Sequence, residues 1–73
     1  SRAAIYTAIM ADRAAAPGDR AYALYRAVRC YAPAGNNSCG GEAVDQPVRR
    51  AWFQRLKRDY PGSPWAKTIK GYW

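Results

Sequence analysis

The stretch PVRRAWFQRLKRDYPGSPWA, residues 47–66, contains one complete helix and the start of another. Pro47 suits a first helical turn, because its fixed φ matches the helix and no N–H is needed there. At about 100° per residue, Trp52, Leu56 and Tyr60 share one face. The outer face is polar and carries Arg50, Gln54, Lys57 and Arg58. The pattern predicts an amphipathic helix from Pro47 to about Asp59, with its apolar stripe against a core.

The residues after this helix predict a sharp break and a short fourth helix. Tyr60-Pro61-Gly62 ends the helix, because proline and glycine interrupt the helical pattern. Ser63-Pro64 then reads as an N-cap followed by a first-turn proline, so a helix is expected from Trp65 to about Lys70. An isolated helix of this length is marginal in water. Its aromatic residues therefore either fold back on the preceding helix or await a partner chain.

Two more helices are expected on the N-terminal side. The first runs from Arg2 to Ala16, is rich in alanine and is ended by Pro17-Gly18. Asp19 is expected to cap the second, which continues to about Ala32. Strand signals are poor, because no stretch alternates apolar and polar residues with β-branched enrichment. The sequence predicts an all-α fold of antiparallel helical hairpins, with three long helices and a short C-terminal one.

The faces of these two helices differ. On the second helix, a core face of Leu24, Val28 and Tyr31 opposes an outer side of Tyr22, Arg26 and Arg29. The first helix has an apolar side, comprising Ile5, Tyr6, Ile9 and Met10, and a small-residue side, comprising Ala4, Ala8, Ala11 and Ala15. Two packable sides fit a helix between neighbours in a stacked array. Alternatively, the alanines simply favour helix formation.

Length and charge bound the class of protein. The 73 residues, taken as one domain over 1–73, form a small core that is marginal without help. The net charge is +7, from 12 Lys+Arg against 5 Asp+Glu. Such a balance attracts acidic partners, although it also serves simple solubility. No run of about 18 apolar residues occurs, so no membrane span is expected. Because the chain opens on Ser1, we interpret it as a processed form or as part of a longer protein.

Two cysteines, Cys30 and Cys39, are separated by eight residues rich in turn formers. A disulfide between them would stabilise the fold by about 2–3 kcal/mol in the chain-entropy model and would imply an oxidising compartment. The alternative is two free thiols. Two cysteines without any histidine cannot complete a four-ligand zinc site in one chain.

The residues that carry catalysis are sparse. Histidine, the commonest general base, is absent. The five carboxylates are scattered, and no glycine-rich phosphate loop occurs. We therefore expect no enzymatic activity, no cofactor and no bound metal.

Nucleic-acid binding is the main alternative to protein binding. Residues 46–73 carry seven lysine and arginine residues against Asp59 alone, with aromatic residues interleaved. Cations beside aromatic faces suit phosphates and bases. Against this, Trp52 and Tyr60 lie on the face assigned to the core. Basic helices of this kind also suit membrane surfaces.

The segment Leu56–Ala66, an apolar helix end followed by Tyr-Pro, a short turn, Ser-Pro and a new helix, resembles a junction between helical repeats. It is similar to the tetratricopeptide-like (TPR-like) repeats of Gram-negative envelope proteins, such as the outer-membrane-assembly lipoprotein and the Tol-Pal coordination protein. The second and third helices would form one repeat of an α-solenoid fragment. The chain departs from the standard repeat in its long loop, residues 34–46, which contains Cys39.

The resemblance implies a non-catalytic scaffold module that binds a protein or peptide, located in the periplasm or at the outer membrane. We expect an acidic or apolar partner to contact the outward basic face and the terminal aromatics. These residues are Tyr22, Arg26, Arg29, Arg50, Lys57, Trp65, Tyr72 and Trp73. A purely structural subunit of a larger envelope assembly, with these aromatics buried against other chains, is a further alternative.

Overall fold

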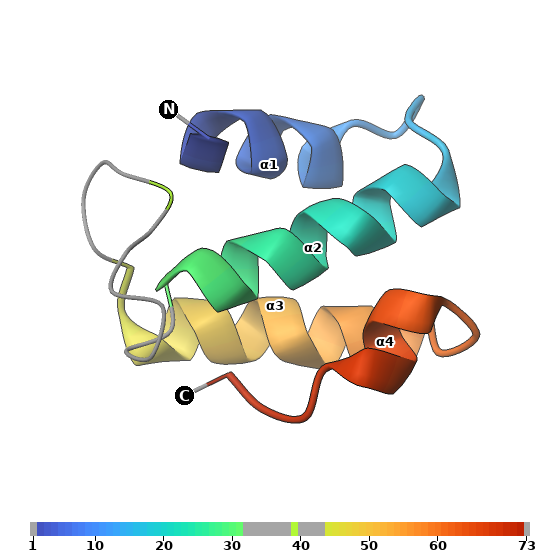
Figure 1. The fold of residues 1–73 in the computed structure, drawn as a ribbon. Helices are drawn as coiled ribbons and strands as arrows, with labels where there is room; N and C mark the ends of the chain where they lie inside the picture. The colour runs from blue at the N-terminus through green and yellow to red at the C-terminus, as the bar shows by residue number, and fades with distance from the viewer. Residues whose placement is uncertain (1, 32–38, 40–43, 73) are drawn as a thin grey trace.

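The computed structural model describes residues 2–31, 39 and 44–72, and these form four helices and no strand (Figure 1). The helices are α1 (Arg2–Ala11), α2 (Pro17–Tyr31), α3 (Gln46–Asp59) and α4 (Pro64–Thr68). The all-α prediction is confirmed. Trp73, named above as a partner-binding residue, lies outside the described residues.

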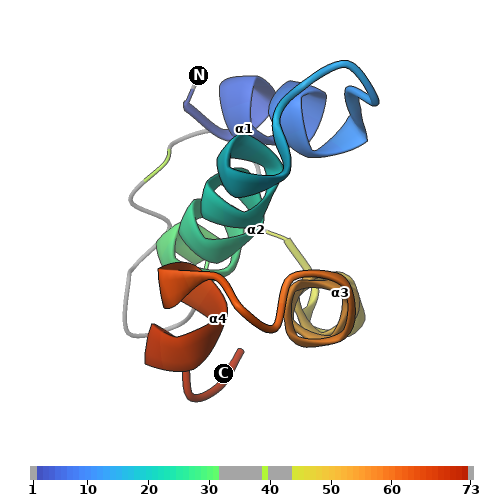
Figure 2. The ribbon, with the colours of Figure 1, turned by 90° about the vertical axis from the view of Figure 1, so that its right-hand side faces the viewer.

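Helix α2 is the centre of the molecule, because it contacts α1, α3 and α4. Helices α1, α2 and α3 run antiparallel to one another in turn, with α1 on one side of α2 and α3 on the other (Figure 1). Figure 2 shows α4 beside α3, with α2 above both. After α4 the chain turns back along α3 (Figure 1).

The core lies where α2 meets its three neighbours. Leu24 and Val28 of α2, Leu56 of α3 and Ile69 after α4 are fully buried. The predicted core faces of the second and third helices are confirmed, because Tyr31 is also buried and Trp52 and Tyr60 are half-buried around Leu56. The alanines of α2 at positions 21, 23 and 27 are fully buried, so neighbouring helices approach α2 closely.

Helix α1 differs from its prediction in length and in packing. It ends at Ala11 and not at Ala16, because the Asp12 carboxylate accepts a hydrogen bond from the Ala14 N–H at 2.9 Å. Such local side-chain bonds compete with helix formation. Met10 is buried as expected, but Ile5 is 58% exposed, so the expected apolar side was partly wrong. Helix α1 packs mainly on α2, and Arg55 of α3 reaches the Met10 carbonyl at its end. Ala8 and Ala11 of its small-residue side are exposed, so the expected stacking of a helix on both sides of α1 is not seen among the described helices.

The other helix boundaries follow the proline and serine signals. Helix α2 begins at Pro17, so the expected cap at Asp19 was wrong, and Asp19 lies in the first turn instead. Helix α3 begins one residue before Pro47 and ends at Asp59 as predicted. The cap of α4 is confirmed, because the Ser63 hydroxyl accepts the Ala66 N–H at 3.1 Å.

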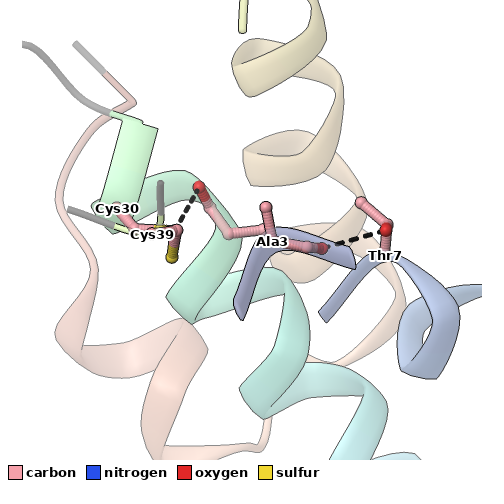
Figure 3. Close-up of a disulfide and its surroundings, with 5 residues drawn as sticks. Ala3, Thr7, Cys30 and Cys39 are labelled. Atoms are coloured by element: carbon pink, nitrogen blue, oxygen red, sulfur yellow. Dashed lines mark hydrogen bonds between the residues drawn. A yellow bond between two sulfur atoms is a disulfide. The ribbon is translucent and has the colours of Figure 1, made fainter. Parts of the chain in front are cut away.

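A disulfide joins Cys30 at the end of α2 to Cys39, with their Cα atoms 5.3 Å apart. Both cysteines are buried and form a second, smaller core cluster with Ala3 and Tyr31. Figure 3 shows this disulfide beside Ala3, whose carbonyl accepts a hydrogen bond from Thr7 Oγ1 at 2.9 Å. The disulfide therefore holds Cys39 beside the start of α1 as well as the end of α2.

Candidate interaction surface

Four aromatic side chains from three helices form a continuous row, which we call the aromatic row: Tyr6, Tyr22, Trp65 and Tyr25. The ring centroids of Tyr6 and Tyr22 are 6.3 Å apart. Trp65 lies 4.8 Å from Tyr22 and 5.3 Å from Tyr25. These spacings are within the range of favourable aromatic pairs. All four rings are half-buried, so each packs on the fold and still meets solvent.

Two arginines of α2 lie over this row. Tyr22, Tyr25, Arg26 and Arg29 occur at helical spacing and so share one face of α2. The guanidinium carbon of Arg26 is 5.9 Å from the Tyr6 ring centroid, and that of Arg29 is 5.7 Å from the Tyr25 centroid. These are cation–π distances. Hydrogen bonding to the Tyr6 side chain raises the pKa of Arg26 above its ordinary value.

The position of Trp65 depends on how α4 is held. The Ser63 cap begins α4, and the Lys57 ammonium donates a hydrogen bond to the Ala66 carbonyl. Trp65 then makes its ring contacts with α2. The C-terminal aromatic residues were expected to fold back on the third helix. Tyr72 does so, because its ring centroid is 5.3 Å from that of Phe53 in α3. Trp65 packs on α2 instead.

The predicted binding residues fall into two groups. Tyr22, Arg26, Arg29 and Trp65 belong to the aromatic row and its two arginines. Arg50 and Tyr72 instead line a hollow beside α3. Lys57 belongs to neither group. Its ammonium donates a hydrogen bond to the Ala66 carbonyl of α4 and lies 5.6 Å from the Phe53 ring centroid. The prediction from the sequence grouped these residues into one surface. Helical spacing identifies the face of a single helix but does not place helices relative to one another.

Sequence reasoning missed the role of Arg49, which was counted only among the seven lysine and arginine residues of 46–73. Arg49 is only 8% exposed. Its Nε donates to the Tyr72 carbonyl at 3.0 Å, and its Nη1 donates to the Val44 carbonyl. The signal was present in the spacing, because Arg49 lies seven residues before Leu56 and so shares the core face of α3.

Other cations of the basic C-terminal region are also engaged. Arg55 donates to the Met10 carbonyl at 2.7 Å, at the end of α1. Arg58 pairs with Asp59 at 2.8 Å on the surface, and this hydrogen bond lowers the pKa of Asp59 below its ordinary value. Part of the positive charge that suggested nucleic-acid binding therefore serves the fold.

The described part of the chain contains no group of three or more metal-capable histidine, cysteine or carboxylate side chains. Among those same residues, no helix has the length and apolar character needed to cross a membrane.

Fold and surface together define a small, disulfide-bonded chain whose described residues form four helices with a mixed aromatic and cationic face. No protein-family model, curated protein or solved structure matches it.

Proposed function

We propose that the chain is a non-catalytic protein-binding scaffold module and that the aromatic row with Arg26 and Arg29 contacts the partner. The proposal depends on the aromatic row. In it, half-buried rings from α1, α2 and α4 lie together beside two arginines of α2. Tyrosine, tryptophan and arginine are the residue types enriched at binding hot spots. A surface built from these residue types, with its rings partly exposed to water, is therefore favourable for contact with a partner protein.

The packing of the row supports binding for an energetic reason. Tyr22 contacts both Tyr6 and Trp65, so each ring is already ordered by its neighbours. A binding surface that is ordered in advance loses less conformational entropy on association. The net charge of +7 favours a partner with an acidic surface, since complementary charge speeds encounter and gives specificity.

We further propose an envelope location and a TPR-like repeat role. The disulfide supports an oxidising compartment. The antiparallel helix pairs and the Ser63-Pro64 helix start are compatible with the repeat resemblance. A location in the periplasm or at the Gram-negative outer membrane agrees with both the disulfide and the repeat resemblance. A role as one subunit of an envelope assembly agrees with them equally.

The test compares partner capture by matched charge variants. The variant Arg26→Glu/Arg29→Glu alters the proposed face, and Arg2→Glu/Arg13→Glu makes the same charge change at exposed positions elsewhere. Each protein is immobilised with its disulfide intact and exposed to a Gram-negative envelope extract. We expect discrete proteins captured by the wild type to be retained by the control and lost by the Arg26/Arg29 variant. Equal capture by both variants would contradict the proposal.

Nucleic-acid binding is less well supported by the geometry. Stacking on single-stranded bases uses an open aromatic face. Trp65 instead contacts two tyrosine rings, and Phe53 contacts Tyr72. Retention on a polyanion column that falls steeply with salt would favour this alternative, because released counterions make such binding strongly salt-dependent.

A further inference from the structure

A second surface feature lies between α3 and the chain that follows α4. It is a hollow of about 350 Å³ lined by Gln46, Pro47, Arg50, Ala51, Gln54 and Tyr72. A neighbouring hollow of about 390 Å³ shares Gln46 and Tyr72 and extends to Lys70. We call the two together the α3–tail hollow. Its lining comes from α3 between Gln46 and Gln54 and from residues 70–72 after α4. Figure 1 shows this last segment running back along α3.

The wall formed by Tyr72 is fixed by two contacts. The buried Arg49 guanidinium donates to the Tyr72 carbonyl at 3.0 Å. The Tyr72 ring also lies 5.3 Å from the Phe53 ring. The Tyr72 side of the hollow is therefore held by contacts within the fold, and binding sites in proteins are usually largely formed in advance.

The lining of the α3–tail hollow has a definite chemistry. Among the described residues that line it, the charged side chains are Arg50 and Lys70, and none is a carboxylate. Both glutamines of the chain, Gln46 and Gln54, are in the lining. A glutamine amide both donates and accepts, so it can pair with a peptide backbone. An arginine fork pairs with a carboxylate through two parallel hydrogen bonds.

We infer that the α3–tail hollow binds an extended, carboxylate-bearing peptide segment of another protein, with Arg50 as the anchor for the carboxylate. Gln46 and Gln54 contact the peptide backbone, and Lys70 contributes a second positive charge. Tyr6, Tyr22, Tyr25 and Trp65 do not line the hollow. The inference therefore stands apart from the aromatic row, and either surface can fail without the other.

The test uses a fluorescent, N-acetylated hexaglutamate peptide and its hexaglutamine counterpart as the control peptide. Arg50→Gln removes the anchor, whereas Lys67→Gln removes one charge at an exposed position of α4 outside the hollow. Loss of a charge-assisted pair should weaken hexaglutamate binding about tenfold or more in Arg50→Gln. Lys67→Gln should bind within about twofold of the wild type, as expected for a screened surface charge. Equal weakening by both variants would mean net-charge attraction alone and would overturn the inference.

Nuclear magnetic resonance locates the peptide directly. Because the chain has two glutamines and both line the hollow, their side-chain amide signals report on it without ambiguity. We expect both signals to shift on hexaglutamate addition and to stay unchanged with hexaglutamine. Unchanged glutamine signals at saturating hexaglutamate, or tighter binding of hexathymidylate at the same signals, would overturn the peptide assignment.

Discussion

Two adjacent arginines of α3 have different roles. Arg49 is buried and donates hydrogen bonds to the carbonyls of Tyr72 and Val44, which lie on either side of it along the chain. Arg50 is exposed and lines the α3–tail hollow. One step of 100° around the helix accounts for the difference, because it moves a side chain from the edge of the core to the surface. Residue type alone therefore does not reveal which cation serves the fold.

The first prediction separates these two roles by stability. Arg49→Ala leaves two carbonyls without their charged donor and should lower the free energy of unfolding by about 2–3 kcal/mol. Arg50→Ala, at an exposed position, should change it by about 0.5 kcal/mol or less. Urea unfolding of both variants, followed by circular dichroism, measures the difference. Similar midpoints for the two variants would show that the Arg49 hydrogen bonds contribute little to stability.

At the scale of elements, local punctuation predicted the C-terminal half of the chain well. The end of α3 at Asp59 and the cap of α4 at Ser63 follow from proline, glycine and serine signals that act over a few residues. The end of α1 was mispredicted. Alanine propensity indicated a helix to Ala16, but α1 ends at Ala11, where the Asp12 carboxylate accepts a hydrogen bond from the Ala14 N–H. Propensity is a weak prior, and one competing side-chain hydrogen bond can override it.

The second prediction tests this explanation of the end of α1. Asp12→Ala removes the carboxylate that accepts the Ala14 N–H, so α1 should extend by about one turn into the alanines that follow. Asp12→Asn keeps a side-chain oxygen acceptor and should leave the helix end where it is. Backbone chemical shifts of residues 13–15 measure the outcome. Unchanged shifts in Asp12→Ala would show that packing on α2, and not the Asp12 side chain, ends the helix.

At the scale of the whole molecule, the sequence could indicate most of the residues of the candidate surface but not that they lie together. Tyr22, Arg26, Arg29 and Trp65 were singled out in the sequence, but Tyr6 was assigned to the apolar side of the first helix. The aromatic row joins positions 6, 22 and 65, and these meet only after α1 and α4 pack on α2. Helical periodicity describes one helix at a time. Contacts across helices depend on packing that the periodicity does not contain.

The disulfide connects this packing to the stability of the whole chain. A domain of this size buries only about 60% of its unfolded surface, so its core leaves little margin. The smaller core cluster consists of Ala3, Cys30, Tyr31 and Cys39, and thus joins Cys39 to α1 and α2. Removing the covalent link therefore affects both the unfolded ensemble and one end of the folded core.

The third prediction is that this link supplies a large part of the stability. Replacing both cysteines, Cys30→Ala/Cys39→Ala, should lower the free energy of unfolding by about 2–3 kcal/mol, because the unfolded chain regains the entropy of the opened loop. A reductant should shift the unfolding midpoint of the wild type in the same direction and leave that of the double variant unchanged. Urea unfolding with and without reductant gives all four values. Equal midpoints for oxidised wild type and double variant would mean that the helices hold together by their packing alone.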